Sequence, residues 1–122
     1  MSRGKKPLLA DGSIVGDYDP LMKYFEIAKS ENPKVAEDCI PRTEDFNYVR
    51  NYINVRGRTS LSSLLELLTM NVTERVNAEI AVKAFREVYG VELNPEDARE
   101  RIARIIAGWI IEACRILGYV EY

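Results

Sequence analysis

The sequence predicts an all-α fold, a compact bundle of about five helices with a helix-turn-helix-like arrangement and an extended N-terminal arm. Two observations support this prediction. From residue 20 onward, capping residues, prolines and glycines separate segments whose apolar residues recur every three or four positions. Residues 1–19 contain three glycines and a proline but no sustained apolar period. We therefore expect an arm at residues 1–19 and one helical domain at residues 20–122.

The first two predicted helices have clear boundaries. Asp19–Pro20 combines a capping residue with a favoured first-turn proline and should open a helix that reaches about residue 29. Asn32–Pro33 should end it, because the residue before a proline avoids helical dihedrals. A second helix should begin at Thr43 and stop at Gly57, which suits the left-handed conformation at a helix end. Its apolar face would consist of Phe46, Val49 and Ile53.

The next two helices are predicted from hydroxyl caps. Thr59 or Ser60 should cap the third helix, and Thr73 should cap a fourth helix that stops at Gly90. The apolar stripe of the third helix would be Leu61, Leu64, Leu65 and Leu68, and that of the fourth would be Val76, Ile80, Ala84 and Val88.

The fifth helix carries the strongest signal. Asn94 is a capping residue, Pro95 suits the first turn, and Glu96 and Asp97 complement the positive end of the helix dipole. We expect this helix to run from Pro95 to about Leu117, where Gly118 terminates it.

This last helix is apolar on more than one side, so it needs neighbours on more than one side. In so small a domain we expect a second subunit to cover the extra face, which would make the protein a dimer or a larger assembly. Coverage by other helices of the same chain is the alternative. The predicted subunit interface consists of Ile105, Ile106, Trp109, Ile110 and Ile111.

Composition excludes several functional classes. The chain has no histidine and only two widely separated cysteines, so zinc sites and Ser-His or Cys-His catalysis lack their residues. Cys39 and Cys114 could form one disulfide or remain two small buried thiols. We expect no metal, no cofactor and no enzymatic activity.

The longest apolar stretch is interrupted by charges, so we expect no membrane span. The absence of glutamine is typical of a thermophilic source.

Charge distribution points to nucleic acid. Acidic residues outnumber basic ones by 19 to 17, yet residues 1–10 and residues 46–60 each carry three cations and no acid. Local sign decides where a polyanion can lie. Asparagines at helical spacing in the second segment add uncharged donors for phosphates. The alternative is an ordinary solvated surface whose arginines pair with Glu44, Asp45 or acids on a partner. The predicted contact residues are Arg3, Lys5, Lys6, Asn47, Arg50, Asn51, Asn54, Arg56 and Arg58.

A family resemblance agrees with this interpretation. Met1–Pro7, Tyr18 with Lys23 and Phe25, and then Asn32–Pro33 before Val35–Ala36 resemble the major capsid proteins of filamentous and rod-shaped archaeal viruses. The resemblance implies helical subunits that dimerise and wrap double-stranded DNA in an A-like form, along a helical virion assembled in the host cytoplasm. It also implies self-association or a paralogous capsid subunit as partner. Acids from Glu66 onward should then face outward or pair across subunits.

Two other functions stay open. A helix-turn-helix or winged-helix regulator would use helices at 60–71, 74–89 and 95–117 and a strand-like Tyr119–Tyr122. Acids in the first turn of its recognition helix, at Glu96 and Asp97, argue against groove binding. A helical protein-interaction subunit without nucleic acid is the third interpretation; either cellular protein would be cytoplasmic. A regulator should prefer one DNA sequence, a capsid protein should coat any duplex, and an interaction subunit should bind neither.

Overall fold

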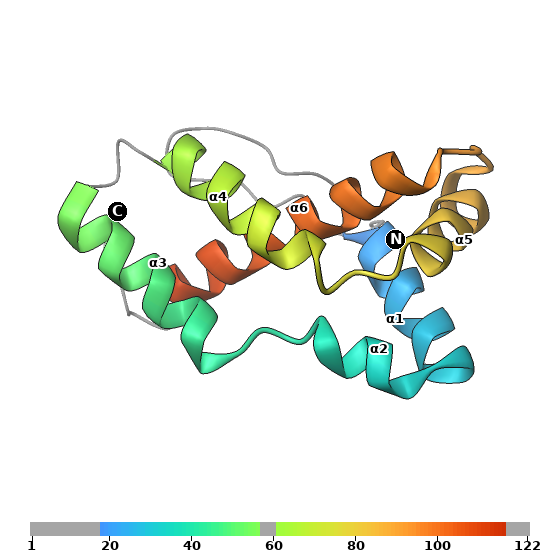
Figure 1. Cartoon of the computed structure of the whole chain (residues 1–122), viewed down its shortest axis with the longest axis horizontal. Coiled ribbons are helices and arrows are strands. Elements are labelled where there is room, and N and C mark those ends of the chain that lie inside the picture. Colours follow the sequence, from blue (N-terminus) through green and yellow to red (C-terminus); the bar gives the residue numbers. More distant parts are fainter. Residues whose placement is uncertain (1–17, 57–60, 117–122) are drawn as a thin grey trace.

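The computed structural model describes residues 18–56 and 61–116, which form six α-helices and no strand (Figure 1). The predicted all-α class is confirmed. Residues 1–17 of the predicted arm and the strand-like Tyr119–Tyr122 lie outside the described residues. The helices are α1 (Asp19–Glu31), α2 (Pro33–Asp38), α3 (Thr43–Arg56), α4 (Leu61–Thr73), α5 (Ala78–Tyr89) and α6 (Pro95–Ile116).

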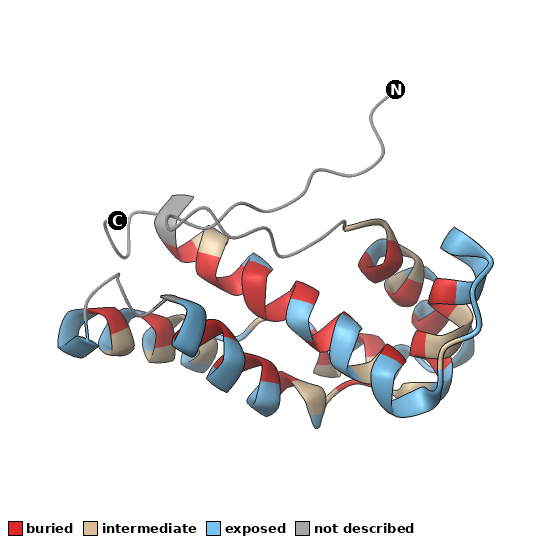
Figure 2. Ribbon diagram, turned by 90° about the horizontal axis from the view of Figure 1, so that it is seen from above, coloured by how far each residue is buried: buried red, intermediate tan, exposed pale blue. Residues whose placement is uncertain are grey.

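Helix α6 is the central element of the bundle. It packs against α4, α5, α3 and α1, while α1 also packs against α5 and α2. In Figure 1, α3 and α4 lie toward one end of α6, and α1 and α5 lie toward the other. Figure 2 shows that α6 is buried along most of its length. The fold therefore depends on apolar residues around most of the α6 circumference.

The apolar faces of α6 are covered differently from the subunit interface predicted for them. Ile105, Ile106, Ile110 and Ile111 are at most 6% exposed, because helices of the same chain cover them. Trp109 is the exception in the predicted set, with 37% of its surface exposed. The alternative of coverage within the chain therefore applies to these four isoleucines.

Helix boundaries follow local capping signals in most places. Asn32 separates α1 from the short helix α2, and Gly90 ends α5 with a left-handed φ of 70°. The Asn94 side-chain oxygen accepts a hydrogen bond from the Asp97 N–H at 2.9 Å, as expected for an N-cap. At the start of α1, Tyr18 holds the N-cap position and Asp19 lies in the first turn instead. Thr59, Ser60, Gly57 and Gly118 lie outside the described residues.

The predicted cap at Thr73 is wrong. Helix α4 continues through Thr73, whose hydroxyl donates to the Thr69 carbonyl oxygen at 2.7 Å. Asn77 caps α5 instead, since its side-chain oxygen accepts a hydrogen bond from the Ile80 N–H at 3.0 Å. Val76, assigned to the fourth helix by its spacing, lies buried in the connection between α4 and α5.

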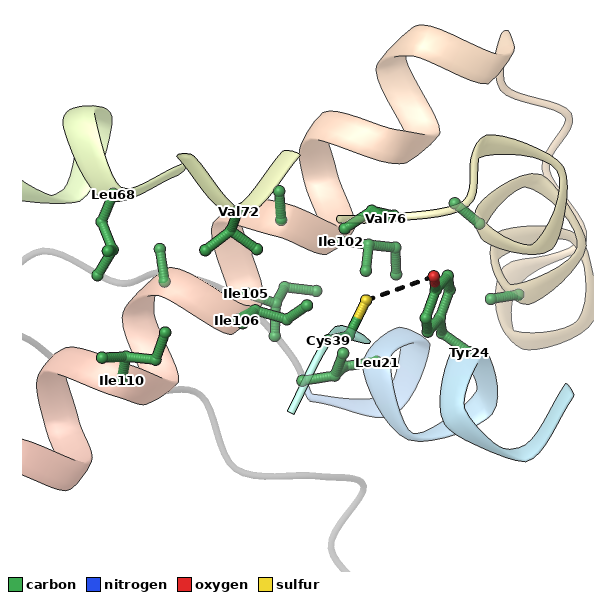
Figure 3. Close-up of a cluster of buried hydrophobic side chains, with 14 of the residues drawn as sticks. Leu21, Tyr24, Cys39, Leu68, Val72, Val76, Ile102, Ile105, Ile106 and Ile110 are labelled. Carbon is green, nitrogen blue, oxygen red and sulfur yellow. Dashed lines mark hydrogen bonds between the residues drawn. The ribbon is translucent and has the colours of Figure 1, made fainter. Parts of the chain in front are cut away.

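A buried tyrosine connects three segments of the core. The Tyr24 hydroxyl on α1 accepts a hydrogen bond from the Asn77 N–H at 2.8 Å. It accepts another from the Cys39 thiol at 3.5 Å (Figure 3). The same thiol also contacts the Arg75 carbonyl oxygen at 3.3 Å. Burial raises the pKa of the Tyr24 hydroxyl, so it stays protonated and neutral inside the core. Tyr24 thereby fixes α1 and α2 against the α4–α5 connection.

Two arginines tie this connection to other helices. The Arg75 guanidinium donates to both carboxylate oxygens of Asp45, at 3.0 and 3.2 Å, and joins the connection to α3. Arg99 on α6 donates from Nε to the carbonyl oxygens of Thr73 and Val76, at 2.9 and 3.1 Å. Those carbonyls lie at and just after the end of α4, where a helix leaves acceptors unpaired.

Candidate nucleic-acid interface

The outward face of α3 carries the described part of the predicted interface. Val49 and Ile53 are buried on the inner side, where α3 packs against α6 and α4. Spacings of three and four residues bring four polar side chains onto one side of the helix. This outward face consists of the exposed residues Asn47, Arg50, Asn51 and Asn54.

Within the outward face of α3, Arg50 and Asn47 form a pair. The Arg50 Nη2 atom donates a hydrogen bond to the Asn47 side-chain oxygen at 3.1 Å. A guanidinium has five N–H donors, and this bond uses one of them. The contact restricts the rotamers of both side chains and reduces the entropy that would be lost on binding. The pair thus places a guanidinium and an amide side by side on an exposed helix surface.

Arg56 does not belong to the outward face. It follows Asn47 by nine residues, or about two and a half helical turns, which puts it on the opposite side of α3. Its guanidinium carbon lies 5.9 Å from the Tyr52 ring centroid, a cation–π distance. Tyr52 in turn stacks on Tyr48 with ring centroids 6.4 Å apart. The predicted contact set is therefore divided between two sides of the helix, and Arg3, Lys5, Lys6 and Arg58 lie outside the described residues.

Asp45, the acid of α3 that is nearest in sequence to the outward face, has its ion-pair partner outside this helix. Asp45, considered above as a partner for the α3 arginines, binds the Arg75 guanidinium and also accepts a hydrogen bond from the Arg42 N–H at 2.8 Å. Residues 46–56 contain no acid at all. The two carboxylates of α3 lie in its first turn, at Glu44 and Asp45. The rest of this helix therefore presents only cationic and neutral side chains.

Several cations outside α3 are neutralised by acids of the same chain. Arg104 on α6 pairs with Glu66 on α4 at 2.8 Å. Arg99 does pair within α6, with Glu96 at 3.9 Å. Pairs also connect Lys83 with Glu31 and Arg86 with Glu92. Acids such as Glu66 and Glu92 thus meet cations of their own chain, and no second subunit is needed to pair them.

The start of α6 is acidic. A cleft of about 360 Å³ between α4 and α6 is lined by Glu66, Glu96, Asp97 and Glu100, together with Thr69, Met70 and Thr73. Phosphates would be repelled from this cleft. The following turns of α6 are largely buried in the bundle. The first turn of α6 therefore presents carboxylates where a major-groove recognition helix would place donors.

The two cysteines are buried free thiols. Burial raises the pKa of the Cys114 thiol to about 11, although the nearby positive charge of Arg50 opposes that shift. Burial also raises the pKa of the Cys39 thiol. Both thiols are therefore protonated near neutral pH and poor nucleophiles. Within the described ranges, no group of three or more His, Cys, Asp or Glu side chains is arranged to hold a metal ion.

No protein-family model, curated protein or solved structure matches this chain. None of the helices in the described ranges is both long and apolar enough to cross a membrane.

Proposed function

We propose that this protein is a structural nucleic-acid-binding protein that self-associates and coats double-stranded DNA through phosphate contacts in a helical virion. The main support for the proposal is the outward face of α3. It presents a guanidinium and three side-chain amides on a helix that has no acid after its first turn. These are donors that bind phosphate oxygens without reading the base sequence.

Local charge favours α3 over the other described surfaces. Exposed charges act over about 8–10 Å at physiological salt, so a polyanion responds mainly to the charges nearest to it. Around α6 and α5, acids lie within hydrogen-bonding distance of Arg104 and Arg86. Along α3, residues 46–56 contain no acid, and the Arg50 guanidinium donates a hydrogen bond to the neutral amide of Asn47. An overall net charge of −2 is therefore compatible with DNA contact on this face.

The small number of cations per chain favours coating over isolated binding. Only six cations lie in the two acid-free segments, and Arg50 is the one on the outward face of α3. A single subunit should therefore bind DNA weakly. Many subunits repeated along one duplex would bind strongly, because each attached neighbour raises the effective concentration of the next contact. The weak binding expected of a single subunit therefore supports an assembled coat as the functional state.

Reversing the charge of Arg50 tests the proposed contact. We expect Arg50→Glu to weaken binding to a random-sequence duplex by about tenfold, or ~1.4 kcal/mol, because it replaces a charge-assisted phosphate contact with repulsion. Fluorescence anisotropy of a labelled duplex at low ionic strength measures this change. Two unrelated duplex sequences should bind equally well, whereas a sequence-reading regulator would prefer one of them.

Lys29→Glu is the matched control, since Lys29 is exposed at the end of α1, away from α3 (Figure 1). It makes the same change in net charge as Arg50→Glu. We expect it to leave the affinity almost unchanged. Equal weakening by both variants would mean that only net charge matters, and no effect of Arg50→Glu would remove α3 from the interface.

A further inference from the structure

An apolar groove lies where the start of α1 meets α6. It has a volume of about 210 Å³ and an almost entirely apolar lining, formed by Tyr18, Leu21, Met22 and Phe25 with Trp109 of α6. Leu21 forms a buried part of the lining, whereas Met22 is 65% and Trp109 37% exposed. An apolar cavity of about 150 Å³ can accept a benzene-sized group, so this groove has room for aliphatic side chains. Filling it would remove apolar surface from water.

The chain itself supplies an apolar segment next to the groove. Tyr18 is the first described residue and also lines the groove, so the preceding residues leave from its rim. Those residues include the apolar pair Ile14–Val15. An extended chain spans at most about 3.3–3.6 Å per residue, so Val15 is restricted to within about 10 Å of Tyr18. The intervening Gly16–Asp17 is a sequence typical of turns, which would allow the chain to fold back.

We propose that the side chains of Ile14 and Val15 occupy the groove of their own chain and cover Met22 and Trp109. The short connection to Tyr18 makes this contact intramolecular, with an effective concentration in the millimolar range or higher. A second copy would have to compete with that tethered segment. This proposal does not depend on DNA binding, because it uses only the apolar groove and the sequence beside it.

The single tryptophan of the chain makes the groove directly observable. We would measure acrylamide quenching and the emission maximum of Trp109 in the full chain and in an Ile14→Asp/Val15→Asp variant. The proposal predicts stronger quenching and a shift to longer wavelengths in the variant. Removal of residues 1–17 should give the same result. Circular dichroism should show that the helices of both variants are retained.

Leu8→Asp/Leu9→Asp is the matched control, because it places the same two charges farther from Tyr18 along the chain. It should leave Trp109 as protected as in the full chain. The proposal is overturned if Trp109 is equally quenched in the full chain and the Ile14→Asp/Val15→Asp variant, or if only the control exposes it. Protection that falls on dilution would assign the groove to a second copy, and protection lost on removing residues 119–122 would assign it to the C-terminal residues; either result excludes Ile14 and Val15.

Discussion

Replacing Ile106 with alanine should destabilise the protein by about 2–5 kcal/mol, a large part of the ~5–15 kcal/mol that typically separates folded and unfolded domains. Ile106 is completely buried in the middle of α6, where this helix is surrounded by its neighbours (Figure 3). The substitution removes apolar atoms and leaves a cavity that the packed helices only partly fill. Denaturant unfolding followed by circular dichroism would give the change in free energy.

Val55→Ala is the control for this prediction, because Val55 on α3 is 80% exposed. It should change the free energy of unfolding by no more than about 0.5 kcal/mol. The effect of Ile106→Ala should also be independent of protein concentration, since Ile106 is buried within one chain. A loss that depended on concentration would return Ile106 to a subunit interface. A loss no larger than that of Val55→Ala would contradict the central role of α6.

Breaking the Asp45–Arg75 pair should produce the second large effect. Both side chains are mostly shielded from water, at 13% and 16% exposure, and two hydrogen bonds connect them. Arg75→Met or Asp45→Asn should each cost about 2 kcal/mol, because either change leaves its partner charged and desolvated. The double variant should cost little more than either single variant, with a coupling energy of about 1–2 kcal/mol in a double-mutant cycle.

The exposed Arg86–Glu92 pair provides the comparison. It also has two guanidinium–carboxylate hydrogen bonds, at 2.9 and 2.6 Å, but lies in solvent. Its coupling energy should be far smaller than that of Asp45–Arg75, because water and salt screen exposed charges. Equal coupling in the two cycles would mean that shielding from water does not strengthen the Asp45–Arg75 pair.

Sequence signals predicted helix boundaries correctly where those boundaries depend on a few neighbouring residues. Asn94, Gly90 and Asn32–Pro33 act on their own neighbouring backbone, so their effects are readable from a few residues. Thr73 had the right chemistry for a cap, but α4 continues through it and ends where Arg99 of α6 binds the carbonyls. Asn77, only four residues later, was an equally suitable cap. The choice between the two depends on tertiary contacts.

The features of the candidate site also divide into those that local sequence patterns predicted and those that depend on tertiary contacts. Helical spacing correctly grouped the three asparagines of α3 on one exposed face, but grouping by acid-free segment also included Arg56, which lies on the other side. The partner of Asp45 is 30 residues away, and no local pattern indicates it. Apolar periodicity revealed that α6 needs several neighbours but not that the same chain supplies them. The groove beside Trp109 likewise depends on how α1 meets α6.

The salt dependence of DNA binding shows whether this protein holds a duplex through its phosphates. We would measure the affinity of the full chain and of a chain lacking residues 1–10 for a random duplex at several salt concentrations. The deleted segment holds three cations, and each phosphate neutralised contributes about 0.9 to the log–log salt slope. We expect sequence-independent binding and a slope that is shallower by roughly 2–3 without the segment. Absence of binding even at low salt, or an unchanged slope, would contradict it.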